Sequence, residues 1–400
     1  MASRRTLIVT GSPVERVLLL YSATGNGHKS VSQAVRASIA EASNAKCWEM
    51  EVFAAVQPPL IGRWPSVYSW LATRSVWFYN VLFRLTDTYR ISSAMSRVIY
   101  RLARSGIGAI LLDIDPDVVV ATAPFVGQVA ARVRGELRAD FRIVNIVSDL
   151  VTPHASWVCR EAEATVVCSP FAMTRVLKGG MPEERILETT FPVQGAFRED
   201  NIGKEEHRRE LGLDPDRFTI TLSGGSLGSG PILSSAKALN RAFPAAQLLM
   251  VAGHNKRLYD LLISQFTDDH SRVYGFTDQM PTLLRASDVI VSKGGPSSIM
   301  EACAARRPVV VISEIGLQER GNGNLARHIG IGYSAASVSE TIAIVESLKH
   351  KLEVAGEEGH RPYAADGSHE IAKLILSPGL GQNLCVLPPG LRQSPLAGHA

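Results

Sequence analysis

The sequence has no large excess of either charge, few cysteines and no long apolar run. Its 42 lysines and arginines nearly balance 38 aspartates and glutamates over 400 residues, which is not typical of a general nucleic-acid-binding protein. Its five cysteines form no C-x-x-C pair, which argues against a zinc site or a disulfide framework. No stretch reaches the roughly 18 uncharged apolar residues of a spanning helix, and no signal peptide is credible. We therefore expect a reduced, cytoplasmic globular protein.

One stretch departs from this charge balance. Between residues 52 and 112, seven arginines stand against a single acidic residue, Asp87, and aromatic side chains are concentrated there. Arginines and aromatics together suit a surface at the headgroup level of an anionic bilayer. We therefore predict five membrane-facing side chains: Trp70, Trp77, Arg84, Arg90 and Arg97. The alternative is a buried helical pair with its arginines in solvent.

Continuous apolar runs alternate with helical patterns along most of the chain. Strands that are apolar throughout are covered on both faces, so the pattern predicts two doubly wound α/β domains facing a cleft. The predicted strands are Arg16–Tyr21, Asp117–Ala121, Arg142–Ser148, Ala164–Cys168, Phe218–Ser223, Gln247–Ala252, Arg272–Gly275, Asp288–Ser292 and Pro308–Ser313. The expected divisions are a tail (1–15), an N-terminal domain (16–197), a linker (198–216), a C-terminal domain (217–355), a helical segment (356–377) and a disordered tail (378–400).

The first predicted strand runs into a glycine-rich turn, S-A-T-G-N-G-H-K-S at residues 22–30, which begins a helix. Such a turn exposes N–H groups and the helix dipole to an anion. Gly25 and Gly27, with Glu49 or Glu51 further on, also approach a dinucleotide fingerprint, so an NAD(P)-dependent oxidoreductase is an alternative. His28 favours another chemistry, because a histidine at the helix start can take a proton from a hydroxyl.

Three polar or glycine-rich turns follow strands of the second half. The turn at residues 223–231 includes Gly225 and would let a ligand approach the backbone. The segment S-K-G-G-P-S-S-I-M-E at residues 292–301 begins a helix whose N–H groups and serine hydroxyls would hold a diphosphate. Glu301 comes one turn later, where a carboxylate can bond both hydroxyls of a ribose. The amide and carboxylate side chains at residues 316–324 suit sugar hydroxyls.

Taken in order, these motifs resemble those of one family. The matching segments are residues 25–30, Ser148-Asp149-Leu150 with His154 and Trp157, Gly275-Phe276-Thr277, residues 293–296 with Glu301, and residues 318–322. They look like the motifs of monogalactosyldiacylglycerol synthases and bacterial diacylglycerol glucosyltransferases, relatives of the peptidoglycan enzyme that adds N-acetylglucosamine to a lipid carrier. The resemblance implies a GT-B fold and an inverting transfer of galactose or glucose from a UDP-sugar to 1,2-diacylglycerol, with no metal or other cofactor.

The resemblance also implies roles for individual residues. His28 would deprotonate the lipid hydroxyl or place it, Asp149 would be a second catalytic residue, and His154 and Trp157 would lie on the acceptor side. The implied donor-binding residues are Gly25, Gly27, Gly225, Phe276, Thr277, Lys293, Gly294, Gly295, Ser297, Ser298, Glu301, Gln318, Glu319 and Asn322. Among them, the backbone around Phe276 would hold uracil, Glu301 the ribose, residues 293–298 the diphosphate, and Gln318, Glu319 and Asn322 the sugar. The enzyme would work at the inner face of an anionic membrane; another lipid or lipid-linked acceptor is the alternative.

Overall fold

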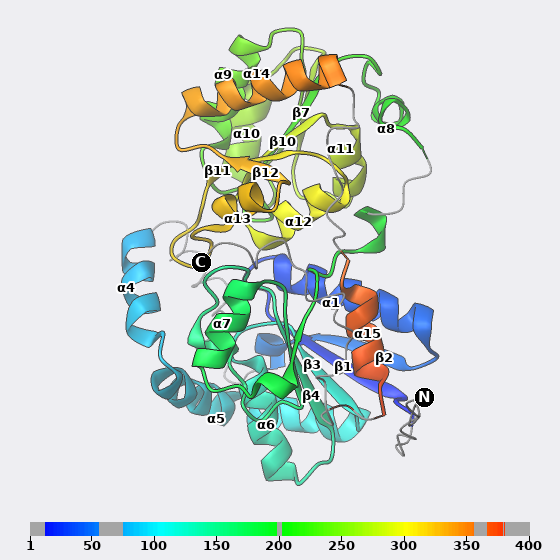
Figure 1. The fold of residues 1–400 in the computed structure, drawn as a ribbon, viewed down its shortest axis with the longest axis vertical. Coiled ribbons are helices and arrows are strands. Elements are labelled where there is room, and N and C mark those ends of the chain that lie inside the picture. Colours follow the sequence, from blue (N-terminus) through cyan, green and yellow to red (C-terminus); the bar gives the residue numbers. More distant parts are fainter. Residues whose placement is uncertain (1–12, 56–74, 198–201, 356–365, 379, 381–400) are drawn as a thin grey trace, which may run out of the picture.

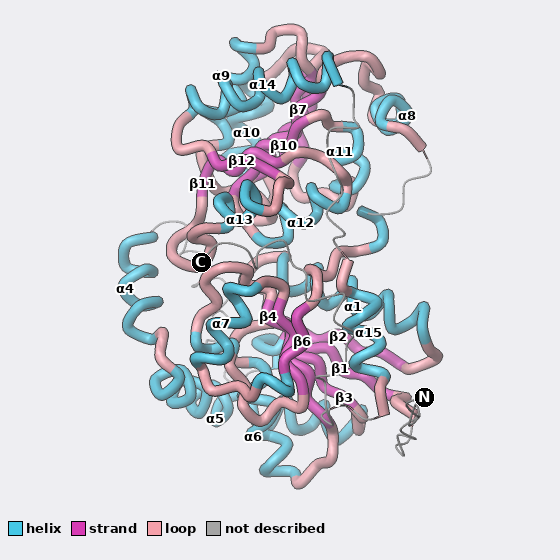
Figure 2. Tube along the Cα trace, viewed as in Figure 1, coloured by secondary structure: helices cyan, strands magenta, loops and turns pink. Residues whose placement is uncertain are grey.

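The chain forms two α/β domains stacked end to end (Figure 1). The computed structural model describes residues 13–55, 75–197, 202–355, 366–378 and 380. In both domains the strands gather into a central sheet with helices around it (Figure 2). The prediction of two doubly wound α/β domains is confirmed, because each sheet has six strands and all pairings are parallel.

The N-terminal sheet has the strand order β2-β1-β3-β4-β5-β6. Its strands are β1 (Arg16–Tyr21), β2 (Lys46–Glu51), β3 (Val118–Ala121), β4 (Arg142–Val147), β5 (Ala164–Val167) and β6 (Ile186–Glu188). The helices of this half are α1 (Gly27–Ala42), α4 (Val76–Thr86), α5 (Tyr89–Ile114), α6 (Val126–Leu137) and α7 (Pro170–Lys178). Single 3-10 turns are η1 (Val52–Ala55), η2 (Ala155–Trp157), η3 (Glu183–Arg185) and η4 (Gly195–Phe197). The central strands β3 and β5 are buried along their whole length, which explains their unbroken apolar sequences.

The C-terminal sheet has the strand order β12-β11-β10-β7-β8-β9. Its strands are β7 (Thr219–Ser223), β8 (Gln247–Val251), β9 (Ser271–Tyr274), β10 (Val289–Lys293), β11 (Val309–Ser313) and β12 (Gly332–Ser334). Its helices are α8 (Lys204–Glu210), α9 (Ile232–Ala242), α10 (Lys256–Gln265), α11 (Met280–Ala286), α12 (Pro296–Ala304), α13 (Asn322–His328) and α14 (Val338–Ala355). Because the strands are parallel, the loops after their carboxyl ends gather at one edge of the sheet, and this edge faces the N-terminal domain.

The last described helix, α15 (Ser368–Leu376), returns to the N-terminal domain. Figure 1 shows it beside α1 and β2 in the lower half of the molecule. The Ser38 hydroxyl donates to the Ser368 hydroxyl over 2.8 Å in the buried contact between α1 and α15. His369 adds a contact of 2.9 Å with Glu41 at the surface. The predicted helical segment 356–377 thus contributes one helix to the N-terminal domain.

Helix α8 lies within residues 198–216, for which the sequence predicted a linker. It packs against α11, and its Arg208 is only 3% exposed. The Arg208 guanidinium donates to Asp288 over 2.6 Å and to the Ala286 and Pro215 carbonyls. Asp288 also accepts from Lys204 at 2.7 Å and from the Thr219 N–H at 2.8 Å. These bonds fasten the first helix after the domain junction to the C-terminal sheet.

We expect Arg208→Ala to lower the free energy of unfolding by about 3 kcal/mol, because it leaves the buried Asp288 carboxylate without its closest cation. The matched control is Arg209→Ala, since Arg209 pairs with Glu206 at the surface and should cost less than about 0.5 kcal/mol. Urea denaturation followed by circular dichroism measures both. Equal losses in the two variants would contradict a stabilising role for the buried network.

Candidate active site

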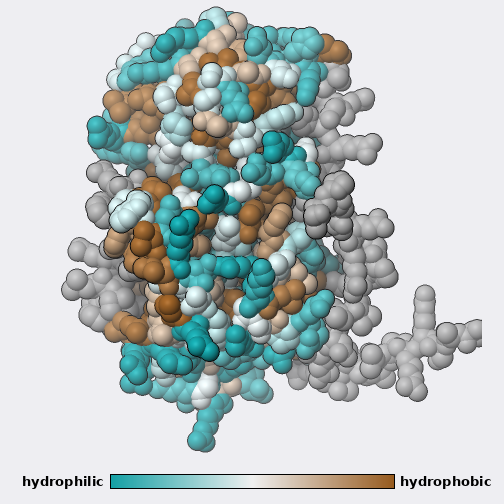
Figure 3. All heavy atoms as spheres, turned by 60° about the vertical axis from the view of Figure 1, so that its left-hand side comes forward, coloured by the Kyte–Doolittle hydropathy of each residue, from teal (hydrophilic) through white to brown (hydrophobic). Residues whose placement is uncertain are grey.

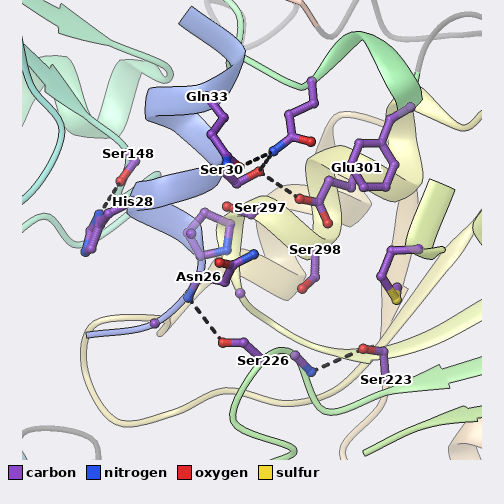
Figure 4. Close-up of a pocket in the computed structure, with 18 of the residues that line it drawn as sticks. Asn26, His28, Ser30, Gln33, Ser148, Ser223, Ser226, Ser297, Ser298 and Glu301 are labelled. Atoms are coloured by element: carbon purple, nitrogen blue, oxygen red, sulfur yellow. Dashed lines mark hydrogen bonds between the residues drawn. The ribbon is translucent and has the colours of Figure 1, made fainter. Parts of the chain in front are cut away.

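A cavity of about 780 Å³ lies between the two domains, at the carboxyl edges of both sheets. Figure 4 shows it from inside, with α1 on one side and α12 on the other. The cavity brings together most of the site residues proposed from sequence: Gly25, Gly27, His28, Asp149, Gly225, Phe276, Thr277, Lys293, Gly295, Ser297, Ser298, Glu301, Gln318 and Glu319. The proposed residues His154, Trp157, Gly294 and Asn322 do not line it.

His28 is held at the start of α1, in the wall of the cavity that the N-terminal domain forms. Its side chain is buried, and its Nδ1 lies 3.3 Å from the Ser148 hydroxyl. The centroids of its ring and the Trp157 ring are 5.5 Å apart in an edge-to-face arrangement. Burial lowers the pKa of His28 to about 4, and a hydrogen bond with the Thr122 backbone offsets this only in part. The imidazole is therefore neutral at physiological pH and able to accept a proton.

Asp149 follows β4 and is hydrogen-bonded to both domains. Its Oδ2 accepts the indole N–H of Trp157 at 2.7 Å, and its Oδ1 accepts from the Gln318 amide at 3.1 Å. Burial raises the pKa of Asp149 to about 6, while these two hydrogen bonds oppose the rise. Trp157 therefore lies behind the cavity, where it touches His28 with its ring and Asp149 with its N–H.

His154, predicted to lie on the acceptor side, makes a buried contact between α4 and η2. Its Nδ1 accepts the Ser156 N–H at 3.1 Å, and its Nε2 lies 3.1 Å from the Thr86 hydroxyl. Because that hydroxyl donates to the Leu82 carbonyl at 2.7 Å, it accepts from His154, which places the ring proton on Nε2. Burial lowers the pKa of His154 to about 4. The ring thus joins α4 to η2 and does not reach the cavity.

The glycine turn after β7 approaches the side chain of Lys293. Gly225 has a φ of +66°, and a Cβ there would lie 2.8 Å from the Lys293 Cε. Glycine is required at such a position both by its backbone angle and by this close approach. Lys293 forms a short ion pair with Glu319, whose other oxygen accepts the Ile315 N–H at 2.9 Å. Lys293 thus lies between the turn that contains Gly225 and the loop that carries Glu319.

Helix α12 begins at the Gly-Gly-Pro-Ser segment and points its N-terminus into the cavity. Figure 4 shows the Ser297 and Ser298 side chains at this end of the helix. Asn322, predicted to touch the sugar, is instead fully buried and donates to the Gly294 carbonyl at 2.8 Å. The bond between Asn322 and Gly294 therefore supports the turn on the side away from the cavity, whereas Ser297 and Ser298 line the cavity.

Glu301 meets the opposite domain across the cleft. Its carboxylate accepts the Ser30 hydroxyl of α1 at 3.2 Å (Figure 4). Within the N-terminal domain, the Gln194 amide donates to Gln33 of α1 at 2.9 Å. Burial raises the pKa of Glu301 to about 7, and the bond from Ser30 opposes the rise. A second contact joins the domains where the Asn26 N–H donates to the Ser226 hydroxyl at 3.1 Å.

Phe276 stands on the rim of the cavity and is 48% exposed. Its ring stacks on that of His254, with centroids 4.2 Å apart and planes 10° from parallel. The stack supports the backbone from residue 275 to 277, next to the turn at Ser226, whose carbonyl accepts the His254 N–H at 2.8 Å.

Sequence reasoning missed several residues of the site. Ser30, Gln33, Ser148, Gln194 and Ser226 line the cavity, and His254 supports its rim. Ser30 lay inside the glycine-rich segment at residues 22–30, so its proximity to the site could have been inferred. Ser148 and Ser226 also lay inside segments singled out from sequence, at residues 148–150 and 223–231. Gln33 on α1, and Gln194 and His254 in loops, carry no motif of their own.

The predicted membrane-facing residues lie on α4 and α5, except Trp70, which is outside the described residues. On α4, Trp77 is 76% exposed and Arg84 is also exposed; on α5, Arg90 and Arg97 are exposed. Further apolar side chains are exposed on the same helices: Val76, Phe78, Leu85, Ile91, Val98 and Leu112. Figure 3 shows apolar and hydrophilic side chains interleaved on the face of the molecule that includes α4. Within the described part of the chain, no helix is both long and apolar enough to cross a bilayer.

Comparisons with known proteins agree with this architecture. Residues 28–193 match the family model described as monogalactosyldiacylglycerol (MGDG) synthase, and residues 219–355 match the glycosyltransferase family 28 C-terminal domain. A chloroplastic monogalactosyldiacylglycerol synthase of Spinacia oleracea is 28% identical over 341 residues. The aligned region is 82% of this chain and 64% of the spinach protein, so the chain spans less than two thirds of that relative.

Solved structures share the fold at low sequence identity. A UDP-GlcNAc 2-epimerase from Neisseria meningitidis has a TM-score of 0.55 at 13% identity, covering 89% of this chain and 98% of that one. MurG of Acinetobacter baumannii has a TM-score of 0.51 at 13% identity, covering 90% and 99%. The GT-B fold expected from the resemblance is thereby confirmed. The chain thus joins a region that matches the monogalactosyldiacylglycerol synthase family model to one that matches the glycosyltransferase family 28 C-terminal domain, on a GT-B fold.

Proposed function

We propose that this enzyme moves a hexose, galactose or glucose, from UDP-hexose to the hydroxyl of 1,2-diacylglycerol at an anionic membrane surface, inverting the anomeric centre. The observation that carries the proposal is one shared cavity. A buried, neutral His28 lines it from one domain, and the N-terminus of α12 with Glu301 lines it from the other. The family of the N-terminal domain supports a glycolipid product.

The C-terminal domain supplies the groups that suit a nucleoside diphosphate. The N–H groups and serine hydroxyls at the start of α12 would receive the diphosphate, and Lys293 would add positive charge. Glu301 would accept both ribose hydroxyls in place of Ser30, and the backbone beside Phe276 and Thr277 would receive uracil. Gln318 and Glu319 would contact the hexose. The N–H groups and hydroxyls at the start of α12, together with Lys293, would stabilise the charge that develops on the departing UDP. We therefore propose a reaction that uses no metal.

The N-terminal domain supplies the proton acceptor. His28 takes the proton of the lipid hydroxyl as its oxygen forms a bond to the anomeric carbon, on the face opposite to UDP. The bond between that carbon and the β-phosphate oxygen breaks at the same time, and its electron pair leaves with UDP. One such displacement inverts the anomeric centre. Asp149 lies next to this step, where its negative charge would favour the imidazolium that forms.

The exposed surface of α4 and α5 suits contact with lipid headgroups. Trp77 and Phe78 would enter the interfacial region, while Arg84, Arg90 and Arg97 would meet anionic phosphates. This contact would bring diacylglycerol, which stays in the bilayer, to the enzyme. The protein would then be held peripherally on the inner face of the membrane.

The decisive experiment supplies radiolabelled UDP-galactose and UDP-glucose, in separate reactions, to the purified chain with anionic vesicles that contain diacylglycerol. We expect label from one donor in the lipid extract, at a mass equal to that of hexosyldiacylglycerol. Label in another lipid of a mixed extract would establish another acceptor. Absence of labelled lipid with either donor, in the presence of every acceptor offered, would overturn the proposal.

We expect His28→Ala to lower kcat by about 10²-fold or more, the usual contribution of a general base, while the affinity for UDP-hexose is largely kept. Steady-state kinetics and calorimetric titration measure the two quantities. Ser148→Ala, which removes only the hydroxyl beside Nδ1, is the control and should lose much less. An unchanged kcat in His28→Ala would contradict the proposed role of His28 in the proton transfer.

The pKa of Glu301 predicts the pH dependence of donor binding. The ionised carboxylate accepts ribose hydroxyls best, and burial raises its pKa to about 7. Affinity for UDP-hexose should therefore fall as the pH drops below 7, by at most about tenfold per pH unit. Calorimetry with UDP-hexose avoids the terminal phosphate of free UDP, which titrates at about pH 6.

Two isosteric variants assign this pH dependence. Glu301→Gln should bind UDP-hexose more weakly at pH 8 and lose the inflection near 7. Asp149→Asn should keep that inflection, because it leaves Glu301 unchanged. A pH dependence that survives in Glu301→Gln would contradict ribose recognition by this carboxylate.

We expect the triple charge reversal of Arg84, Arg90 and Arg97 to glutamate to weaken sedimentation with anionic vesicles, and added salt to weaken the wild type similarly. The matched control reverses Arg241, Arg257 and Arg327, which are exposed on the C-terminal domain and change the net charge equally. The control should retain more vesicle binding than the first variant. Equal losses of vesicle binding in the two variants would mean that only the net charge of the protein matters, and would contradict a specific role for the arginines of α4 and α5.

A further inference from the structure

Helix α4 has two faces with different surroundings. Val76, Trp77 and Phe78 are exposed, whereas Tyr79 is only 6% exposed and Asn80 is half-buried. The two inner residues contact residues 316–318 of the C-terminal domain. Figure 1 shows α4 at the left-hand edge of the molecule, at the level where the two domains meet. A helix of the N-terminal domain therefore touches the loop that carries Gln318.

Two hydrogen bonds and one close approach make this contact. The Tyr79 hydroxyl donates to the Gln318 Oε1 at 3.0 Å, and the Leu317 N–H donates to the Asn80 Oδ1 at 2.9 Å. Gly316 has a φ of +57°, and a Cβ there would lie 2.7 Å from both Tyr79 and Asn80. Only glycine allows the loop to approach α4 this closely.

The same contact orients the Gln318 amide. Its NH₂ group donates to the Asp149 Oδ1 at 3.1 Å, because an ionised carboxylate can only accept. The carbonyl end of the amide must then face Tyr79, which donates to it. Thr152 holds the backbone of the loop, since its hydroxyl lies 2.6 Å from the Leu317 carbonyl. Two segments of the N-terminal domain, α4 and the loop after β4, thus hold the Gln318 side chain and its backbone in the opposite domain.

We propose that Tyr79 and Asn80 are positioning residues for the hexose of the donor, acting through Leu317 and Gln318. This inference rests on the proposed function of the cleft. The groups proposed for uracil, ribose and diphosphate belong to segments of the C-terminal domain other than residues 316–318, the loop that Tyr79 and Asn80 contact. The affinity for UDP therefore does not depend on Tyr79 or Asn80, whereas the extra affinity that the hexose adds does.

The test compares the dissociation constants of UDP, UDP-galactose and UDP-glucose for the full chain by calorimetry. We expect Tyr79→Phe, which removes only the hydroxyl, to weaken the preferred UDP-hexose about five- to tenfold, the size of one neutral hydrogen bond. UDP affinity should be unchanged, and discrimination between the two hexoses should fall. Asn80→Ala should act in the same direction. Asn80→Asp keeps an acceptor oxygen for the Leu317 N–H and should restore most of the loss.

Two further variants guard against a general loss of structure. Tyr100 of α5 donates its hydroxyl to Glu136 of α6 at the surface. Tyr100→Phe is therefore the matched control and should change the dissociation constant of neither UDP nor UDP-hexose. Gly316→Ala forces the loop away from α4 without altering Tyr79, and should reproduce the selective loss of hexose affinity. Kinetics in the presence of acceptor should show the same selectivity as a higher KM for UDP-hexose.

The outcomes separate this proposal from the proposed function. Equal weakening of UDP and UDP-hexose in Tyr79→Phe, or no weakening of either, would overturn the positioning role while leaving the transferase intact. Failure of Asn80→Asp to restore the loss seen in Asn80→Ala would also count against it. A wild-type chain that binds neither UDP nor UDP-hexose would overturn the proposed function itself.

Discussion

The buried carboxylate of Asp149 joins the two halves of the cleft. It is 3% exposed, and a charge in such a place requires donors around it. Trp157 provides one N–H from within the N-terminal domain, and Gln318 provides another from the C-terminal domain. Burial still raises the pKa of Asp149 to about 6, so the two donors compensate only in part. One side chain thus connects the ring that packs against His28 with a loop of the opposite domain.

Burial shifts the pKa values of one group on each side of the cleft, in opposite directions. On the N-terminal side it lowers the pKa of His28 to about 4, which keeps a neutral base at physiological pH. On the C-terminal side it raises the pKa of Glu301 to about 7, so this carboxylate responds to small changes in its surroundings. The N-terminus of α12 faces the same space with its N–H groups. The proposed base and the proposed site for the diphosphate therefore lie on separate domains, and the fold brings them to one cavity.

The sequence predicted the buried strands well, because strands such as β3 and β5 are covered on both faces and are apolar throughout. It missed β2, whose alternating residues K-C-W-E-M-E are only partly buried at the edge of the sheet, and the three-residue strands β6 and β12. It also took residues 198–216 for a linker, since the charged sequence of α8 resembles one. The charge of Arg208 is compatible with burial only because Asp288, far along the chain, neutralises it.

The sequence alone determined the features that depend on neighbouring residues: apolar strands, glycine-rich turns and the starts of the helices that carry His28 and Ser297. Parallel strands bring such turns to one edge of a sheet, so the general place of the site followed from their order. Only the tertiary structure decided which side chains meet, as with Ser30 and Glu301, which are 271 residues apart. It also placed His154 and Asn322 in buried contacts outside the lining of the cavity. Spacing along the chain fixes local backbone geometry, whereas desolvation and hydrogen bonds between distant segments depend on how those segments pack.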